Sequence, residues 1–336
     1  MLNNQSILIT GGTGSFGKKF TEMILKQYDP KRVIIYSRDE FKQDIMKKEF
    51  MQKYPEKASR LRFFIGDVRD KERLYRAFRG VDYVVHAAAM KQVPACEYNP
   101  FEAIKTNIFG AQNVIDAALD RGVKKVVALS TDKAVNPSNV MGCSKRICEI
   151  YVQSLAKRIE NSGEKSTQFI TTRFGNVLGS NGSVIPLFKD QIKHGGPVTV
   201  THPEIIRYFM TIPEACQLVL EAGSMGKGGE IFIFDMGKPV KILDLAKRMI
   251  RLSGSKNIKI EFTGLRNGEK LYEELLNQAE HTKPTHHEKI MIANVREYEY
   301  HEISQMIDSL IKVSYEYDEM RTVRKMKEIV PEFQSI

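Results

Sequence analysis

The sequence has few cysteines and lacks long apolar runs. Its 336 residues include four cysteines, Cys96, Cys143, Cys148 and Cys216, and no Cys-x-x-Cys spacing. A chain of this length does not need disulfides to fold, so we expect free thiols. No stretch approaches the roughly eighteen apolar residues that a membrane span requires, and the N-terminus shows no signal-peptide pattern. We therefore predict a cytoplasmic protein without a membrane partner.

Clustered charge and metal-ligand spacing are also missing. The net charge is +10, from 51 basic and 41 acidic side chains, but the basic residues are scattered among acids. There is no basic run of five or six residues and no RNA-binding aromatic motif, so we predict no nucleic-acid partner. The positive charge favours a smaller anion such as a nucleotide. His286 and His287 are adjacent rather than spaced as zinc ligands, so no metal site is predicted.

The N-terminal half alternates short β-branched segments with longer amphipathic ones. Strands are predicted at 6–10, 33–37, 61–67, 82–89 and 125–130, each separated from the next by a helical pattern. Strands separated in this way pair in parallel through right-handed crossovers. The pattern predicts an α/β fold with a Rossmann-like, doubly wound parallel sheet.

The order of elements becomes mixed in the second half. A helix at 143–158 and a strand at 168–177 are followed by helices at 212–224, 241–254, 269–278, 300–313 and 318–330. Turn formers are frequent at 182–200 and 281–295, which indicates a smaller mixed α/β lobe with its loops. We predict a first domain over residues 1–170, to which parts of the later chain return. Residues 171–336 then form mainly the smaller lobe and C-terminal helices.

A glycine-rich segment, TGGTGSFG at residues 10–17, lies between the first strand and the first helix. Gly11, Gly14 and Gly17 permit a tight turn, close approach of backbone N–H groups to a pyrophosphate, and close helix packing. This position in an alternating β/α series favours dinucleotide binding over a merely structural turn. Thr13, Ser15 and Phe16 complete the predicted cofactor loop.

The second strand ends in Ser37 and Arg38 rather than in the acidic residue that binds a free ribose. Arginine suits a 2′-phosphate, which favours NADP over NAD. The alternatives are that Arg38 is a solvated loop residue and that Asp39 serves the ribose. Further cofactor contacts are predicted at the ends of the third and fourth strands, for Asp67, Val68, Ala87, Ala88 and Ala89.

Three polar residues, Thr131, Asp132 and Lys133, end the fifth strand. The carboxyl end of this strand lies over the crevice where a nicotinamide would rest, so all three are expected to point into a reaction site. The alternative is a capped surface turn in which Asp132 and Lys133 pair. Lys145 follows Met141 by one helical turn, so both can face the same cofactor, which is typical of a lysine that holds the nicotinamide ribose.

Taken together, these segments resemble the extended short-chain dehydrogenase/reductases that act on nucleotide sugars, and most closely the UDP-N-acetylglucosamine 4,6-dehydratases in a soluble form. The resemblance spans about residues 5–280. It is carried by TGGTGSFG, YSRDE, GDVRD, HAAAMKQVP, KTN, STDKAVNP, MGCSK, RFGNVLGSNGSVIPLF, VTVTHPEIIRYFM and GLRNGEKLYEELL.

The resemblance implies a redox-neutral dehydration. Hydride passes from C4 of the sugar to the nicotinamide, water is eliminated across C5 and C6, and hydride returns to C6. Lys133 is implied as the base at C5, provided that desolvation or a neighbouring positive charge makes its neutral form accessible, and Asp132 as the acid at C6. Met141 stands where the superfamily has a tyrosine, and a thioether does not usefully accept the C4 hydroxyl proton.

We therefore hypothesise a double role for Asp132, which would also take the C4 hydroxyl proton, directly or through Thr131 or water. An Asp132→Asn variant should then lose both cofactor reduction and elimination, and intact C4 oxidation would rule the double role out.

The resemblance also implies a substrate site for UDP-N-acetylglucosamine. Arg207 and Arg266 would hold the diphosphate, for which bidentate arginines are suited. Other implied contacts are to the uridine and sugar from Asn176, Ser183, Val184, Val198 and Thr199, to the ribose from Glu269, to the cofactor and sugar from Lys91, and to the cofactor from Asn107. Each residue alone is equally compatible with an ordinary surface or strand position.

Two other functions stay open: a nucleotide-sugar 4-epimerase or reductase, which needs no acid and base at C5 and C6, and a catalytically silent nucleotide-binding module, which Met141 would favour.

The downstream motifs favour retention of configuration at C5. The family resemblance further implies a homo-oligomer paired through residues 107–121 and 143–158, and a role in bacterial surface-glycan or glycoprotein sugar synthesis.

Overall fold

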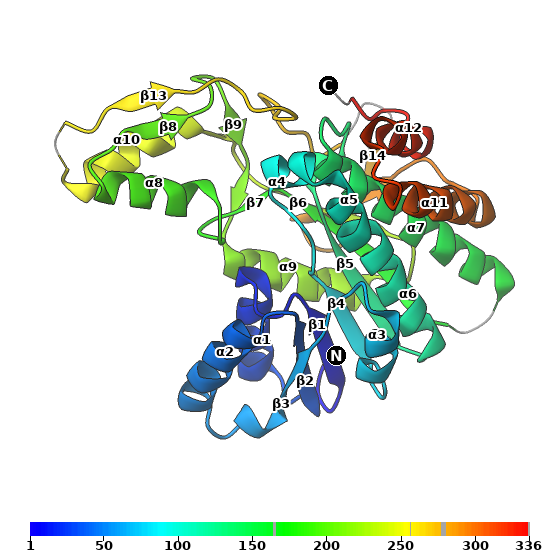
Figure 1. Ribbon diagram of the computed structural model, residues 1–336. Coiled ribbons are helices and arrows are strands. Elements are labelled where there is room, and N and C mark those ends of the chain that lie inside the picture. Colours follow the sequence, from blue (N-terminus) through cyan, green and yellow to red (C-terminus); the bar gives the residue numbers. More distant parts are fainter. Residues whose placement is uncertain (164–165, 256, 277–279, 335–336) are drawn as a thin grey trace.

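The computed structural model describes residues 1–163, 166–255, 257–276 and 280–334, which form a layered body and a smaller projecting lobe (Figure 1). The body is built on a sheet whose strands follow the order β14-β15-β11-β6-β5-β4-β1-β2-β3. Every residue of β1 is buried, as expected for a strand covered on both faces. The site elements therefore rest on a buried central layer.

The six strands β3, β2, β1, β4, β5 and β6 and their neighbour β11 all pair in parallel. At the other edge, β15 pairs antiparallel with β11, and β14 pairs antiparallel with β15. The strands are β1 (Ser6–Thr10), β2 (Arg32–Ser37), β3 (Leu61–Ile65), β4 (Tyr83–His86), β5 (Lys125–Thr131), β6 (Gln168–Phe174), β11 (Ile231–Phe234), β14 (His281–Pro284) and β15 (Ile290–Asn294). The central order 3-2-1-4-5-6 is that of a Rossmann sheet. The predicted doubly wound α/β fold is confirmed.

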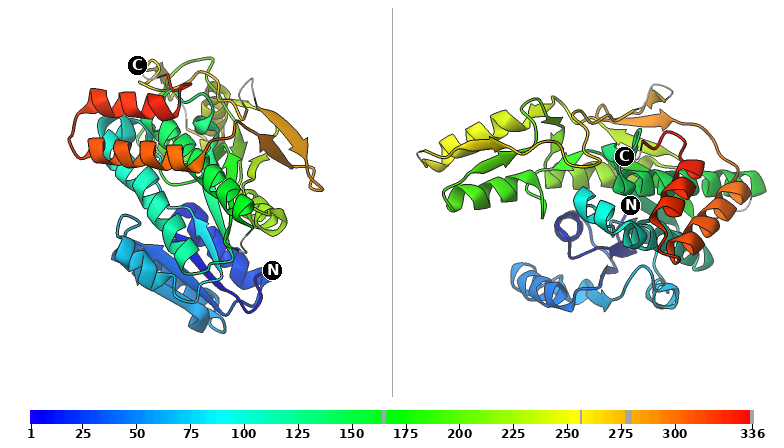
Figure 2. Two further views of the ribbon diagram at one scale, coloured as in Figure 1. Left: turned by 90° about the vertical axis from the view of Figure 1, so that its right-hand side faces the viewer. Right: turned by 45° about the horizontal axis from the view of Figure 1, so that its top comes forward.

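Helices cover both faces of the sheet (Figure 2). One core joins the sheet to α1 (Ser15–Gln27), α2 (Glu40–Lys53) and α9 (Ile212–Met225). The other core joins it to α3 (Lys71–Ala77), α6 (Gly110–Asp120) and α7 (Val140–Ser162). Short helices α4 (Val93–Tyr98) and α5 (Pro100–Ala103) and a π-helical segment, η2 (Ile104–Phe109), lead into α6.

The projecting lobe has its own small core, which contains Phe188, Val198, Val200 and Ile205. It comprises α8 (Val184–Lys193), β8 (Val198–Val200), α10 (Ile242–Ser253) and β13 (Ile260–Phe262), with β8 paired to β13. Two short ladders lie at its base, β7 (Asn176–Val177) with β10 (Phe209–Met210) and β9 (Ile206–Arg207) with β12 (Val240–Lys241). Because α9 and β11 belong to the body, two separate chain segments form the lobe.

The C-terminal helices α11 (Tyr300–Ser314) and α12 (Glu319–Ile329) pack on α7 (Figure 2). Ile303 and Ile307 of α11 join the same core as α7, and the Tyr151 hydroxyl lies 3.5 Å from that of Tyr300. The chain's own helices therefore cover part of the face that we expected to pair between subunits. The oligomeric state itself stays a prediction.

The helix predicted at 269–278 is wrong over 269–276, which form bends and irregular backbone; Asn277 and Gln278 lie outside the described residues. Tertiary contacts override the helical pattern of this segment. The Glu273 carboxylate turns toward the Arg207 guanidinium, with 3.9 Å between Oε1 and Nε, and the Leu275 carbonyl accepts a hydrogen bond from Arg173. A helix over these residues would not make both contacts, to Arg207 and to Arg173.

The structure bears on the predictions about membrane spans and disulfides. Among the described residues, we find no helix with the length and apolarity to cross a bilayer. All four cysteines are free thiols, and three of them are buried.

Candidate active site

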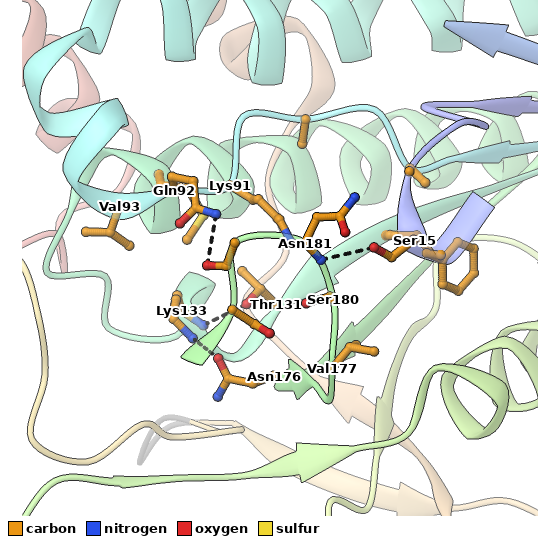
Figure 3. A pocket seen from close by; sticks show the side chains of 18 of the residues that line it. Ser15, Lys91, Gln92, Val93, Thr131, Lys133, Asn176, Val177, Ser180 and Asn181 are labelled. Carbon is orange, nitrogen blue, oxygen red and sulfur yellow. Dashed lines mark hydrogen bonds between the residues drawn. The ribbon is translucent and has the colours of Figure 1, made fainter. Parts of the chain in front are cut away.

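A cavity of about 740 Å³ extends from the glycine-rich loop to the projecting lobe. Its walls come from the carboxyl ends of β1, β2, β4, β5 and β6 and from α8 and β9. Figure 3 shows Ser15, Lys91, Lys133 and Asn176 around it. The volume lies in the usual range of small-molecule sites.

The glycine-rich loop lies at one end of the cavity, against the N-terminus of α1. Gly11 has φ = 66°, and a Cβ there would lie 2.9 Å from the Ala88 backbone nitrogen. Only glycine allows this close approach of the β1 and β4 loops. The cavity wall includes the predicted residues Thr13, Ser15 and Phe16, so the loop fits a dinucleotide pyrophosphate.

The end of β2 presents positive charge at the cavity edge. Arg38 is 60% exposed, and its Nη1 lies 3.5 Å from Asp67 Oδ2. Asp39 instead caps α2: its carboxylate accepts a hydrogen bond from the Lys42 amide at 2.9 Å and pairs with the Lys42 ammonium. These contacts hold the pKa of Asp39 below its ordinary value. This carboxylate is therefore already engaged by Lys42.

Thr131, Asp132 and Lys133 follow one another at the end of β5, but they face differently. Asp132 Oδ1 accepts hydrogen bonds from the Thr131 hydroxyl at 2.8 Å and from Lys133 Nζ at 3.0 Å. Thr131 and Lys133 line the cavity, whereas Asp132 is fully buried and does not. Its Oδ2 packs against Gly175, where a Cβ would lie 2.9 Å away. The expectation that all three side chains point into the cavity is therefore wrong for Asp132.

The Lys133 ammonium is held between carboxylates. Its Nζ lies 3.0 Å from Asp132 Oδ1 and 3.6 Å from Glu273 Oε1. Burial disfavours the charged form, but these two carboxylates outweigh both the burial and the repulsion from Arg207, so they raise the pKa of Lys133. The structure thus favours the ammonium, the opposite of the neutral form that the sequence analysis required.

Helix α7 brings Met141 and Lys145 to the same cavity. A Cβ at Gly142 would collide with the Lys133 carbonyl oxygen, so this glycine lets α7 pack directly on the turn that carries Lys133. Lys145 Nζ donates to the Leu129 carbonyl at 2.9 Å, and burial lowers the pKa of this lysine. Met141 supplies a thioether at this wall, so its neighbours must supply any proton acceptor.

A buried ionic network supports the end of β5 from behind. The Ser130 hydroxyl donates to Glu149 Oε1 at 2.6 Å, and Arg173 Nη2 donates to Glu149 Oε2 at 2.7 Å. Arg173, which is fully buried, also donates to Glu280 at 2.8 Å. Arg146 Nη1 lies 3.1 Å from Glu149 Oε2. The network joins β5, β6, α7 and the segment before β14 immediately behind the Thr131–Lys133 turn.

Most of the residues predicted to bind the substrate lie at the cavity, and their role in binding stays a prediction. Arg207 is buried, with Nη2 3.3 Å from Glu269 Oε1, and the Asn176 amide oxygen lies 3.5 Å from Lys133 Nζ. The predicted substrate residues that line the cavity are Lys91, Asn176, Ser183, Val184, Thr199, Arg207, Arg266 and Glu269. The cofactor residues that line it are Gly11, Thr13, Gly14, Ser15, Phe16, Gly17, Ser37, Arg38, Asp67, Val68, Ala87, Ala88, Ala89, Lys91 and Lys145.

Besides Asp132, two further predicted site residues lie away from the cavity. Val198 is fully buried in the core of the lobe, because alternate residues of β8 face inward. Asn107 is also buried; its amide donates to the Met90 carbonyl and to the Ser144 hydroxyl, each at 2.9 Å. Asn107 therefore holds the loop before Lys91 against α7 and does not contact a ligand directly.

Several cavity residues escaped the sequence analysis. The loop at 178–183 bridges two walls of the cavity. The backbone N–H of Asn181 donates to Ser15 Oγ at 3.1 Å, and Gln92 Nε2 donates to the Gly182 carbonyl at 3.3 Å (Figure 3). The sequence analysis named Ser183 at the end of this loop but gave no partners for the loop. Glu273 was missed because its segment has a helical pattern. Within the ranges that the structure describes, no group of three or more potential metal ligands is present.

These features define a Rossmann-like α/β protein with a second lobe over the carboxyl edge of its sheet. Residues 7–295 match the family described as "Polysaccharide biosynthesis protein". The chain belongs to this family.

Its relatives include proteins of known name. The chain is 50% identical over 316 residues to the capsular polysaccharide biosynthesis protein CapD of Staphylococcus aureus, covering 92% of this chain and 51% of CapD. It thus spans about half the length of that relative. It is 48% identical to a Campylobacter jejuni UDP-N-acetylglucosamine 4,6-dehydratase (inverting), covering 82% of this chain and 79% of the relative. A Rickettsia akari UDP-glucose 4-epimerase also matches, at 46% identity over 84% of this chain and 81% of the relative.

The fold has a solved counterpart. The X-ray structure of Pen from Bacillus thuringiensis matches with a TM-score of 0.80 and 41% identity, covering 87% of each chain.

Proposed function

We propose that this protein is a hydro-lyase that converts UDP-N-acetylglucosamine to a UDP-4-keto-6-deoxy-N-acetylhexosamine with a recycled NADP. The observation that carries the proposal is that one cavity joins a glycine loop for a dinucleotide, a lysine at the end of β5 and a buried arginine for phosphate. The name of the Campylobacter relative supports this substrate and reaction. The family description supports a role in polysaccharide biosynthesis.

The cavity fits a nicotinamide dinucleotide along the body. The Gly11–Gly17 loop would hold the pyrophosphate, Ser37 and Arg38 the 2′-phosphate, and Lys145 the nicotinamide ribose. When bound, the nicotinamide would accept a hydride and return it. The chain's own contribution is to hold that ring beside the sugar and to exclude water, since the loop at 178–183 crosses the cavity between Ser15 and Gln92.

An Arg38→Ala variant is expected to bind NADP about ten- to a hundredfold more weakly and NAD unchanged, because only the 2′-phosphate loses a charge-assisted hydrogen bond. Calorimetric titration of both dinucleotides measures the ratio. Lys48→Ala removes an exposed lysine of the following helix α2, paired with Asp44, and serves as the control. Equal weakening of both dinucleotides would contradict the assignment.

The chain's own residues would act on the sugar as follows. Arg207 and Arg266 hold the diphosphate, and Asn176 lies beside Lys133 to orient a sugar hydroxyl. Lys133 removes the C5 proton once its ammonium has lost a proton, since only the amine has a free electron pair. Asp132 orients Thr131 and Lys133 by accepting a hydrogen bond from each.

Incubation with UDP-N-acetylglucosamine and NADP tests the proposal by mass. We expect the sugar nucleotide to lose the mass of one water. An unchanged mass with a new configuration at C4 would instead identify an epimerase, the alternative that the Rickettsia relative favours. No change of any kind would identify a silent nucleotide-binding module.

Configuration at C5 stays a prediction. The downstream motifs of the sequence favour retention, whereas the Campylobacter relative is named as inverting. Proton NMR of the product formed in deuterium oxide distinguishes the two.

A further inference from the structure

Residues 264–268, which we call the arginine loop, carry Arg266 to the cavity wall. All of this loop except Gly268 is exposed. Just before the loop, the backbone N–H of Thr263 donates to the Val200 carbonyl at 3.0 Å. Among the described residues, no side chain pairs with the Arg266 guanidinium, so its position depends on how the two ends of the loop are anchored.

The buried end of the arginine loop is held by the two residues that precede helix α7. The Gly268 carbonyl accepts one hydrogen bond from the Ser138 hydroxyl and another from Asn139 Nδ2, each at 2.9 Å. A Cβ at Gly268 would lie 2.6 Å from Asn139 Cβ, so only glycine allows this approach. We call these two hydrogen bonds the latch.

The Asn139 side chain lies at the cavity, yet the protein engages both of its polar atoms. Oδ1 accepts a hydrogen bond from the Gly142 backbone N–H at 2.7 Å and thereby caps α7, while Nδ2 donates to the latch. The residue is only 4% exposed. A buried amide engaged at both ends braces the elements around it rather than a ligand.

We propose that Asn139 is a positioning residue that holds the arginine loop, and with it Arg266, within reach of the substrate diphosphate. This inference rests on the proposed function, which assigns the diphosphate to Arg207 and Arg266. A guanidinium binds phosphate through hydrogen bonds of fixed direction, so a small shift of the loop weakens the contact. Because Asn139 also caps the helix that carries Lys145, one side chain ties the nucleotide end of the cavity to its cofactor wall.

The latch can be removed without removing the helix cap. Asn139→Ser keeps an oxygen that caps helices well but lacks the amide donor, and Ser138→Ala removes the other donor. In calorimetric titration, each variant is expected to bind UDP about three- to tenfold more weakly, as for loss of one hydrogen bond, and to bind NADP unchanged. Asp318→Ser exchanges the cap of α12 in the same way, away from the cavity, and should leave UDP affinity unchanged.

A double-mutant cycle with Arg266→Ala separates positioning from general structural support. If the latch acts through Arg266, the combined variant Ser138→Ala/Asn139→Ser should weaken UDP binding when Arg266 is present. It should change the affinity by less than about twofold once Arg266 is alanine. The KM for UDP-N-acetylglucosamine should rise by the same factor as the UDP dissociation constant, with kcat changed by less than about threefold, because ground state and transition state share this contact.

Other results would overturn the proposal. Equal weakening of UDP with and without Arg266 would make the latch a general support of the fold. A lower kcat at unchanged KM would mean that Asn139 acts only through its cap on α7. If Asn139→Ser does not fold, Ser138→Ala decides, since it leaves the cap in place, and unchanged UDP affinity in that variant would refute the latch. A wild-type protein that does not bind UDP would instead refute the proposed function.

Discussion

Replacing Lys133 by methionine is expected to slow water loss from UDP-N-acetylglucosamine by about 10² to 10⁴-fold, the usual effect of removing a general base. Methionine keeps most of the side-chain volume at this nearly buried position but cannot accept the C5 proton. Solvent-deuterium exchange at C5, followed by NMR, should fall with water loss. Cofactor reduction is expected to be less affected, because C4 oxidation precedes removal of the C5 proton.

The pH dependence supplies a second measurement of the same role. Since the carboxylates of Asp132 and Glu273 raise the pKa of Lys133 against the effect of burial, the amine is a minor form near neutral pH. The wild-type rate should therefore rise with pH, and Lys133→Met should lose this rise. Lys157→Met, which removes a surface lysine paired with Glu297, is the control. A Lys133→Met variant with the wild-type rate and pH profile would exclude Lys133 as the base.

An Arg173→Met variant is expected to lose about 3–5 kcal/mol of the free energy of unfolding, the usual cost of leaving a buried charge without its partner. Glu149 would lose its closest cation inside the core, where Arg173 Nη2 now lies 2.7 Å from its carboxylate. Urea unfolding measures the change. Arg321→Met, at an exposed arginine paired with Glu316, should leave the free energy of unfolding nearly unchanged.

The effect of Arg173→Met should depend on pH with a defined sign. Burial opposes the charge on Glu149, but Arg173, Arg146 and the Ser130 hydroxyl outweigh it and lower the pKa of this carboxyl. A lowered pKa means that the stabilisation is complete above the ordinary pKa of glutamate and is lost as the pH falls through the lowered value. The two proteins should therefore converge in acid. A constant difference down to acid pH would contradict an ionic origin.

Much of the fold could be predicted because local pattern and topology agree. The runs SILIT, VIIYS and KVVALS are apolar at consecutive positions, as covered parallel strands require, and each became a strand of the main sheet. The segment at 269–276 could not be predicted in the same way. Its helical spacing is real, but Arg173 and Arg207, distant in sequence, draw its polar groups inward.

A site residue could be predicted from the sequence where the backbone conformation decides its position. It could not be predicted where the direction of a side chain depends on its hydrogen-bond partners. Gly11 lines the cavity because a tight turn needs positive φ. Neighbouring positions in the chain do not fix which way a carboxylate turns: Asp132 bonds back to Thr131 and Lys133 and leaves the wall, whereas Glu273 reaches it from a segment 141 positions later in the chain. That choice depends on tertiary packing, which single-sequence reasoning does not contain.

The C-terminal helices extend the folding unit beyond the family match, which ends at residue 295. Ile303, Ile307 and Leu310 of α11 and Met326 of α12 are buried in the core that also holds α7. A fragment trimmed to the matched segment would expose the outer surface of α7 to water and would be prone to aggregate. Truncations for crystallisation or expression should therefore retain both terminal helices.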